Sequence, residues 1–150
     1  MLHQLSKEDV NETFQIRSAL ESYCTLQICK ETNSRKAGKL FKELNKIMEK
    51  MEKIMISSHS IDDFCEYDFR FHTQIINYLE NEQFSSIFAT FMYRMKRLAK
   101  FSLSHEGRME NTYKEHMDIL NAMQSGDVEH IYDITIQHME RPKGINLEDL

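Results

Sequence analysis

Apolar residues recur at steps of three and four along most of this chain, with Lys and Glu filling many of the positions between them. The clearest stripe runs from Ala37 to Met55. Such spacing is typical of an amphipathic helix that buries one face and exposes the other. The pattern therefore predicts helices packed around a shared core.

Capping residues and turn formers divide this pattern into separate helices. Ser6, with Asp9 three residues on, resembles a capping box, and Ser34 and Ser60 can each cap a further helix. Gly126 suits the left-handed position after a helix, and Pro142 is expected to end the last one. The expected helices cover about 6–32, 34–55, 60–79, 83–102, 108–125 and 127–141.

Composition supports a helical protein with one domain. The 150 residues include only four Gly and one Pro, too few turn formers for a protein built of many strands. We expect an all-α antiparallel bundle of six or seven helices over residues 1–141, followed by a flexible tail at 142–150.

Charge and hydropathy limit the possible partners. A net charge of −5, from 24 acidic and 19 basic residues, suits a phosphate backbone poorly, so this chain alone is not expected to bind DNA. No apolar run approaches the roughly 20 residues of a membrane span, and the N-terminus does not resemble a signal peptide. We expect a cytoplasmic protein without membrane contact.

The three cysteines do not indicate a disulfide or a zinc clip. They are odd in number, and Cys24 and Cys29 are five apart on one predicted helix, which points them in different directions. Cys65 lies on another helix. All three are expected to be buried thiols.

Four polar residues fall on the apolar faces of three different helices. Asp68 and His72 are four apart on the third helix, while His116 and His138 lie within the stripes of the fifth and sixth. A lone buried carboxylate costs several kcal/mol, so Asp68 needs a cationic partner. One carboxylate with three imidazoles suits a divalent transition metal such as Zn, Ni, Mn or Fe.

Spacing alone leaves other interpretations open. An inward histidine is often a hydrogen-bonded core residue, and Asp68 could pair with His72 along one helix. The remaining histidines lie at a terminus, at turns or beside a stripe, and are expected to be solvated: His3, His59, His105 and His130.

The motifs of common catalytic sites are absent from the sequence. No Glu has a His three residues later, and there is no His-Glu-x-x-His, Gly-rich phosphate loop or nucleophilic Ser elbow. We therefore expect that the chain is not an enzyme.

An ordered set of short motifs resembles one known domain. Its motifs are the segments 14–21, 68–72, 115–116, 122–127 and 138–139. In this order they resemble the effector-binding C-terminal domain, of the FCD type, in the FadR branch of GntR-type bacterial transcription regulators. The resemblance covers nearly the whole chain, from about Leu5 to Met139.

The resemblance implies a metal-dependent sensor. In that family a helical bundle encloses a metal held by one Asp and three His, and the matching positions here are Asp68, His72, His116 and His138. The resemblance also implies that a small carboxylate binds beside the metal and changes how a dimeric repressor binds DNA. Family members carry a winged helix-turn-helix ahead of this domain. We expect no such DNA-binding domain within the present sequence.

Three further residues are candidates for holding the effector. Arg17 lies on the inner stripe of the first helix, where its guanidinium could bind a carboxylate or pair with Glu21. Arg94 and Asn111 are weaker candidates. A second hypothesis is a structural or partner-binding bundle, based on the Met-rich face of the second helix.

Overall fold

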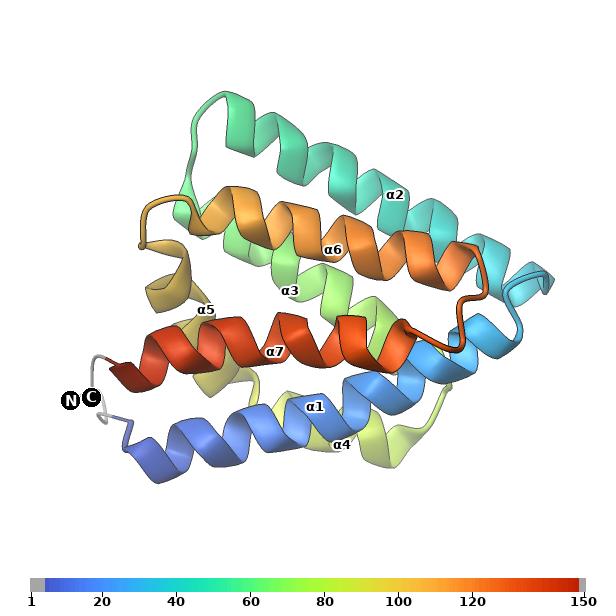
Figure 1. Ribbon diagram of the computed structural model, residues 1–150, viewed down its shortest axis with the longest axis horizontal. Helices are drawn as coiled ribbons and strands as arrows, with labels where there is room; N and C mark the ends of the chain where they lie inside the picture. Colours follow the sequence, from blue (N-terminus) through green and yellow to red (C-terminus); the bar gives the residue numbers. More distant parts are fainter. Residues whose placement is uncertain (1–4, 149–150) are drawn as a thin grey trace.

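The computed structural model describes residues 5–148, and within that range its regular elements are all helices, with no strand. It confirms the all-α fold, with seven helices in an antiparallel arrangement (Figure 1). None of these helices is long and apolar enough to cross a membrane. The helices are α1 (Lys7–Lys30), α2 (Arg35–Ile56), α3 (Ile61–Asn77), α4 (Glu82–Thr90), α5 (Met92–Leu103), α6 (Arg108–Gln124) and α7 (Ile131–Glu148).

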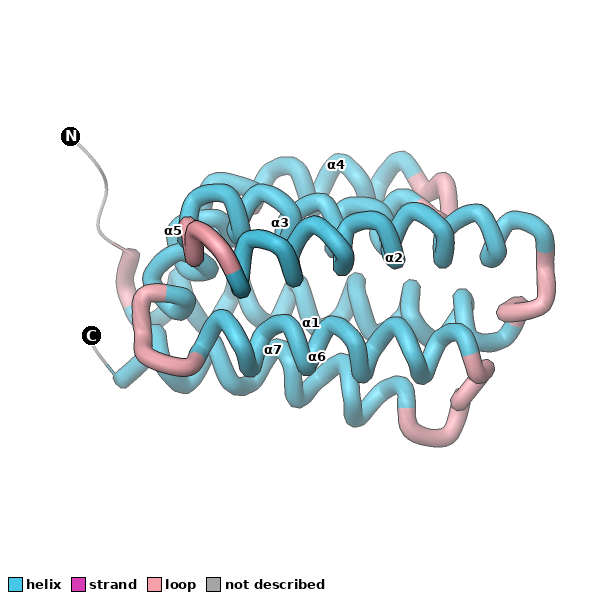
Figure 2. The backbone as a smooth tube through the Cα atoms, turned by 90° about the horizontal axis from the view of Figure 1, so that it is seen from above, coloured by secondary structure: helices cyan, strands magenta, loops and turns pink. Residues whose placement is uncertain are grey.

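The long helices pack side by side. α1 packs along α7, and α2 packs against α3 and α6. Seen from above, α6 and α7 lie on one side of the bundle, and α3 and α4 lie on the other (Figure 2). This arrangement places one face each of α3, α6 and α7 toward the interior, and these helices carry the predicted metal ligands.

Predicted caps fix the starts of three helices. Ser6 and Asp9 form a reciprocal capping box at the start of α1. The hydroxyl of Ser34 accepts a hydrogen bond from a backbone N–H in the first turn of α2, and Ser60 does the same for α3. The starts of these helices are therefore encoded locally.

The predicted helix over 83–102 is wrong as a single element. The chain bends at Phe91, whose φ of −96° and ψ of 2° separate α4 from α5. The buried residues here are Phe88 of α4 and Met95 and Leu98 of α5. The bend lets both short helices follow the surface of the core, and packing of this kind overrides the continuous helical pattern.

The prediction that Pro142 ends the last helix is wrong, because α7 continues to Glu148. The side-chain amide of Asn146 donates to the carbonyl of Leu98 at 3.3 Å and to that of Pro142 at 2.7 Å. Leu147 packs against a small cluster that includes Leu98 and Met139. These contacts with α5 offset the backbone hydrogen bond that proline removes. Positions 149–150 lie outside the described residues.

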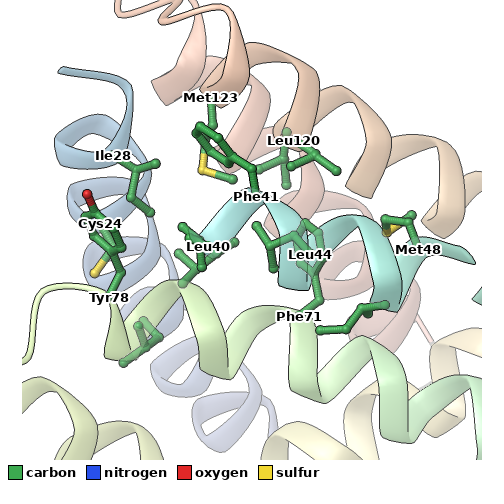
Figure 3. Packing of buried hydrophobic residues seen from close by; sticks show 14 of the residues in the cluster. Cys24, Ile28, Leu40, Phe41, Leu44, Met48, Phe71, Tyr78, Leu120 and Met123 are labelled. Carbon is green, nitrogen blue, oxygen red and sulfur yellow. The ribbon is translucent and has the colours of Figure 1, made fainter. Parts of the chain in front are cut away.

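The main core joins α1, α2, α3 and α6 (Figure 3). Phe41 and Leu44 of α2 lie among Leu120 and Met123 of α6 and Phe71 of α3. The Met-rich face of α2 belongs to this core, since Met48 and Met51 are buried. That face is therefore occupied by the chain itself.

The three cysteines are free thiols buried in the bundle, as expected from the sequence. Burial raises the pKa of Cys24 and of Cys65 to about 12, and that of Cys29 to about 11. All three are therefore protonated and poorly nucleophilic at neutral pH.

Candidate metal centre

The structure brings together the four residues predicted as metal ligands. Asp68 and His72 come from successive turns of α3, His116 from the middle of α6 and His138 from α7. Each offers one ligand atom, and these atoms all lie within 4.8 Å of one another. All four residues are buried.

Short distances join the four side chains. Asp68 Oδ1 lies 2.7 Å from His116 Nε2 and 3.3 Å from His72 Nε2. His138 Nε2 lies 3.2 Å from His72 Nε2. The Nε2 atoms of three imidazoles and one carboxylate oxygen thus share one small volume between α3, α6 and α7.

Hydrogen bonds at the other ring nitrogen orient each imidazole. His116 Nδ1 lies 2.7 Å from the backbone oxygen of Thr112. His72 Nδ1 bonds to a carboxylate oxygen of Glu21, and His138 Nδ1 lies 2.7 Å from Glu115 Oε1. Carbonyl and carboxylate oxygens accept hydrogen bonds, so each Nδ1 carries the hydrogen and each Nε2 presents a lone pair.

With the hydrogen on Nδ1, the Nε2 atom of His116 is an acceptor that faces another acceptor, the carboxylate of Asp68. Asp68 Oδ1 and His116 Nε2 are buried atoms that lack a hydrogen-bond partner despite their close approach. Two lone pairs at such a distance repel each other unless a cation lies in contact with both. The residues present therefore fit a metal ion.

The ionisation states of Asp68 and His138 also favour metal binding. Burial alone would raise the pKa of Asp68, but its contacts with His116 and His72 hold that pKa well below its usual range. Burial and the neighbouring His116 lower the pKa of His138 to about 3. An ionised carboxylate and a neutral imidazole are the forms that bind metals.

The donor set indicates which ions could bind. One carboxylate and three imidazoles suit Zn, Ni, Mn or Fe in their divalent states. Four protein ligands leave open positions on a five- or six-coordinate ion. Asp68, His72, His116 and His138 would hold the ion, and the oxygens bonded to the three Nδ1 atoms would fix the orientation of the imidazoles.

Two small cavities adjoin the carboxylate of Asp68. One, of about 20 Å³, is lined by Arg17, Asp68, Arg108 and His138 among others. The other, of about 10 Å³, is lined by Arg17, Asp68 and His72 among others. Each has room for about one water molecule, next to the convergent ligand atoms.

Of the three predicted effector residues, the structure places only Arg17 at these cavities. Its Nε donates to Glu21 Oε2 at 2.9 Å, so the predicted pairing along α1 is present, and Arg17 also lines both cavities. Arg94 lies 3.4 Å from Asp9 and lines neither cavity. Asn111 is exposed on α6.

The sequence did not predict the roles of several residues around the site. Glu21 and Glu115 are buried partners of two predicted ligand histidines, and Arg108 holds Glu115 through two hydrogen bonds of 2.7 Å. Arg141 also contacts Glu115 at 2.7 Å. The available signals were a Glu directly before His116 and a Glu four residues after Arg17.

The other described histidines lie away from the ligand cluster. His59 bonds to Glu110 at 3.0 Å and His130 to Asp127 at the same distance, all on the outside of the bundle. His105 lies in the turn before α6. His3 is outside the described residues.

Comparisons with known proteins agree with the fold and with the family resemblance. The chain superposes on the metal-free FCD domain of TM0439, a proposed transcriptional regulator, with a TM-score of 0.78 and 18% identity over 98% of this chain and 97% of that one. For the Zn²⁺-bound form of that domain the TM-score is 0.73, with 17% identity over the same shares of the two chains. Among curated proteins, none matches the sequence. The FCD domain model matches residues 12–141, and the chain therefore belongs to the FCD domain family.

Proposed function

We propose that this chain is the ligand-sensing domain of a bacterial transcription regulator of the GntR/FadR type. In this proposal it binds one divalent metal ion through Asp68, His72, His116 and His138, and a small carboxylate beside the metal. The family match and the Zn²⁺-bound FCD domain of TM0439 support this reading.

One observation carries the proposal: four oriented ligand atoms converge next to cavities that Arg17 also lines. A bound divalent ion would act as a Lewis acid with open coordination positions. Arg17 adds a guanidinium, whose planar fork can bind a carboxylate through two hydrogen bonds. The chain thus offers two complementary groups for one small anion, and binding would widen cavities that now have room for about one water molecule each.

Helices from several parts of the chain meet at the site, and this supports a route from ligand binding to a change in helix packing. Five helices contribute to the centre and the first cavity, namely α1, α3, α5, α6 and α7. A ligand that draws their side chains together biases how these helices pack. We propose that a cytoplasmic homodimer transmits this change to a winged helix-turn-helix domain that represses transcription, with DNA contacted only through that domain.

The partner-binding alternative has less support. It was based on the Met-rich face of α2, and Met48 and Met51 of that face are buried in the core of the chain itself. A metal-dependent enzyme would need a catalytic group besides the ligands. The sequence contains none of the common catalytic motifs that accompany such sites.

Elemental analysis of purified protein tests the metal. We expect about one transition metal ion per chain, lost on chelation and lost in His116→Ala. His130→Ala removes an exposed histidine and is the matched control, which should retain the metal. A wild-type chain without metal, whose melting temperature is unchanged by added Zn²⁺, would contradict the proposal.

A thermal-shift screen of small carboxylates, with and without metal, tests the ligand. A molecule that binds the folded state raises its melting temperature. We expect carboxylates to do so only in the presence of metal. The same shift in metal-free protein would contradict binding beside the ion.

A further inference from the structure

Arg17 and Glu21 form a continuous path between the cavities and one metal ligand. Arg17 Nε donates to Glu21 Oε2 at 2.9 Å, and Glu21 Oε1 bonds to His72 Nδ1. All three side chains are buried. This chain of hydrogen bonds runs from α1 to the imidazole of His72 on α3, whose other nitrogen, Nε2, is the predicted ligand atom.

The guanidinium of Arg17 keeps donors for a second partner. Its contact with Glu21 uses Nε, which leaves Nη1 and Nη2 for a ligand in the cavities that Arg17 lines. Those two groups form the planar fork that binds a carboxylate through two hydrogen bonds. One side of Arg17 therefore faces Glu21 and the other can face an anion.

The chain contains a second path of similar make-up that differs in this respect. Arg108 donates from Nη1 and Nη2 to the two oxygens of Glu115, and from Nε to Ser102 at 3.3 Å. Glu115 in turn bonds to His138. Because Arg108 commits all three nitrogens to protein partners, it has no fork to offer an anion. The second path therefore provides an internal control for the first.

We infer that Arg17 and Glu21 are positioning residues that couple carboxylate binding in the cavity to metal binding by His72. The inference rests on the proposed function, since it assumes both a metal and a carboxylate. It adds a role for Glu21 to the proposed function. It also gives the sign of the coupling, since the carboxylate and the metal ion each strengthen the binding of the other.

The direction follows from hydrogen-bond strengths. A carboxylate on Nη1 and Nη2 shares the positive charge of Arg17, so Glu21 keeps more negative charge and accepts more strongly from His72 Nδ1. A stronger bond at Nδ1 makes Nε2 a better metal donor. By thermodynamic linkage, the metal must tighten carboxylate binding by the same factor.

The test compares two matched substitutions, Glu21→Gln and Glu115→Gln. Each neutralises a buried glutamate that bonds to a ligand histidine, so each should weaken metal binding roughly 10–100-fold. The dissociation constant of Co²⁺ is measured from its visible absorption, in sodium acetate and in sodium chloride of equal ionic strength. The ratio of the two constants is the coupling factor.

We expect tighter Co²⁺ binding in acetate for the wild type, and the same coupling factor in Glu115→Gln. In Glu21→Gln the factor should fall at least about threefold, since only this variant breaks the path through Arg17. Arg17→Lys keeps the charge but lacks the fork, and should show the same loss. If Glu21→Gln does not fold, Arg17→Lys alone decides the question.

Three results would overturn the inference. The first is no coupling in the wild type, and the second is an equal loss of coupling in Glu115→Gln. The third is an unchanged coupling factor in Glu21→Gln, or in Arg17→Lys where Glu21→Gln does not fold. Failure of the proposed function is distinct. In that case wild-type protein would bind no Co²⁺ in either salt. Co²⁺ binding that is lost in His116→Ala, but with coupling independent of Glu21, leaves the metal site standing and removes only the inference.

Discussion

Asp68 Oδ1 and His116 Nε2 lie 2.7 Å apart, yet no hydrogen bond joins them. The backbone oxygen of Thr112 fixes the imidazole hydrogen on Nδ1, so both atoms of the close pair are acceptors. Within a buried site, such a pair is stable only with a cation between its members. The relationship supports our proposal that the two side chains hold a metal ion and do not form a simple ion pair.

Asp68→Asn should abolish the stabilisation that a metal provides. The substitution removes the single carboxylate of the ligand set while nearly conserving its shape. Wild-type protein should gain about 4 kcal/mol of stability when free Zn²⁺ is a thousandfold above its dissociation constant. The measurement is the free energy of unfolding in urea, with and without Zn²⁺.

Asp118→Asn is the control for this change. Asp118 pairs with Lys114 on the surface of α6, far less buried than Asp68. Its substitution should leave the Zn²⁺ effect unchanged. An Asp68→Asn variant that Zn²⁺ stabilises as strongly as wild type would exclude Asp68 as a ligand.

Position along the helices was sufficient to predict which four buried polar side chains converge. Asp68 and His72 share a face because they are four residues apart, and His116 and His138 lie within apolar stripes. The partners Glu21 and Glu115 could not be predicted in the same way. Glu21 meets His72 across α1 and α3, and such a contact depends on how two helices pack.

The bend at Phe91 and the continuation of α7 past Pro142 have the same kind of cause. Local pattern favoured one long helix in the first case and a helix end in the second. The bend at Phe91 allows Phe88 of α4 and Met95 of α5 to be buried together. The continuation of α7 is stabilised by the contact of Asn146 with Leu98. Both are tertiary effects that a single sequence does not express.

Gly126→Ala and Gly38→Ala should change stability in opposite directions. Gly126 has a φ of 69°, and a Cβ there would lie 3.0 Å from Thr32 Cγ2. Ala at this position should therefore cost about 1–2 kcal/mol. Gly38 lies within α2 with no atom within 4 Å of an added Cβ, so Ala should stabilise by about 0.5–1 kcal/mol.

Urea unfolding of the two glycine variants measures both effects. The control is internal, because the same methyl group is added at both positions. A stabilising Gly126→Ala would show that the turn between α6 and α7 does not need the left-handed conformation.

Arg108→Ala should destabilise the fold far more than Arg141→Ala. Both side chains contact Glu115, but that of Arg108 is 5% exposed and that of Arg141 is 56% exposed. Breaking the buried pair leaves a carboxylate with too few partners, at a cost of about 3 kcal/mol or more. The exposed contact is screened by water and should contribute less than about 1 kcal/mol.

Thermal and urea unfolding of both arginine variants in metal-free buffer measure this difference. Working without metal separates the stability of the fold from any effect on His138, which Glu115 orients. Equal losses in the two variants would mean that burial of the Arg108 pair does not determine its contribution.

The native protein should resist thiol reagents at pH 8. With pKa values raised to about 12 by burial, Cys24 and Cys65 hold only about one thiolate in ten thousand at that pH. Cys29, whose pKa is about 11, should be the first of the three to react. Because a thiol gains reactivity as the pH approaches its pKa, labelling should accelerate steeply between pH 8 and pH 10.

Titration with a chromogenic disulfide should find no fast-reacting thiol in the folded protein and three in urea. Fast labelling of a folded chain would mean that the bundle opens around α1 or α3, and hydrogen exchange of the amides flanking the labelled cysteine would locate that opening.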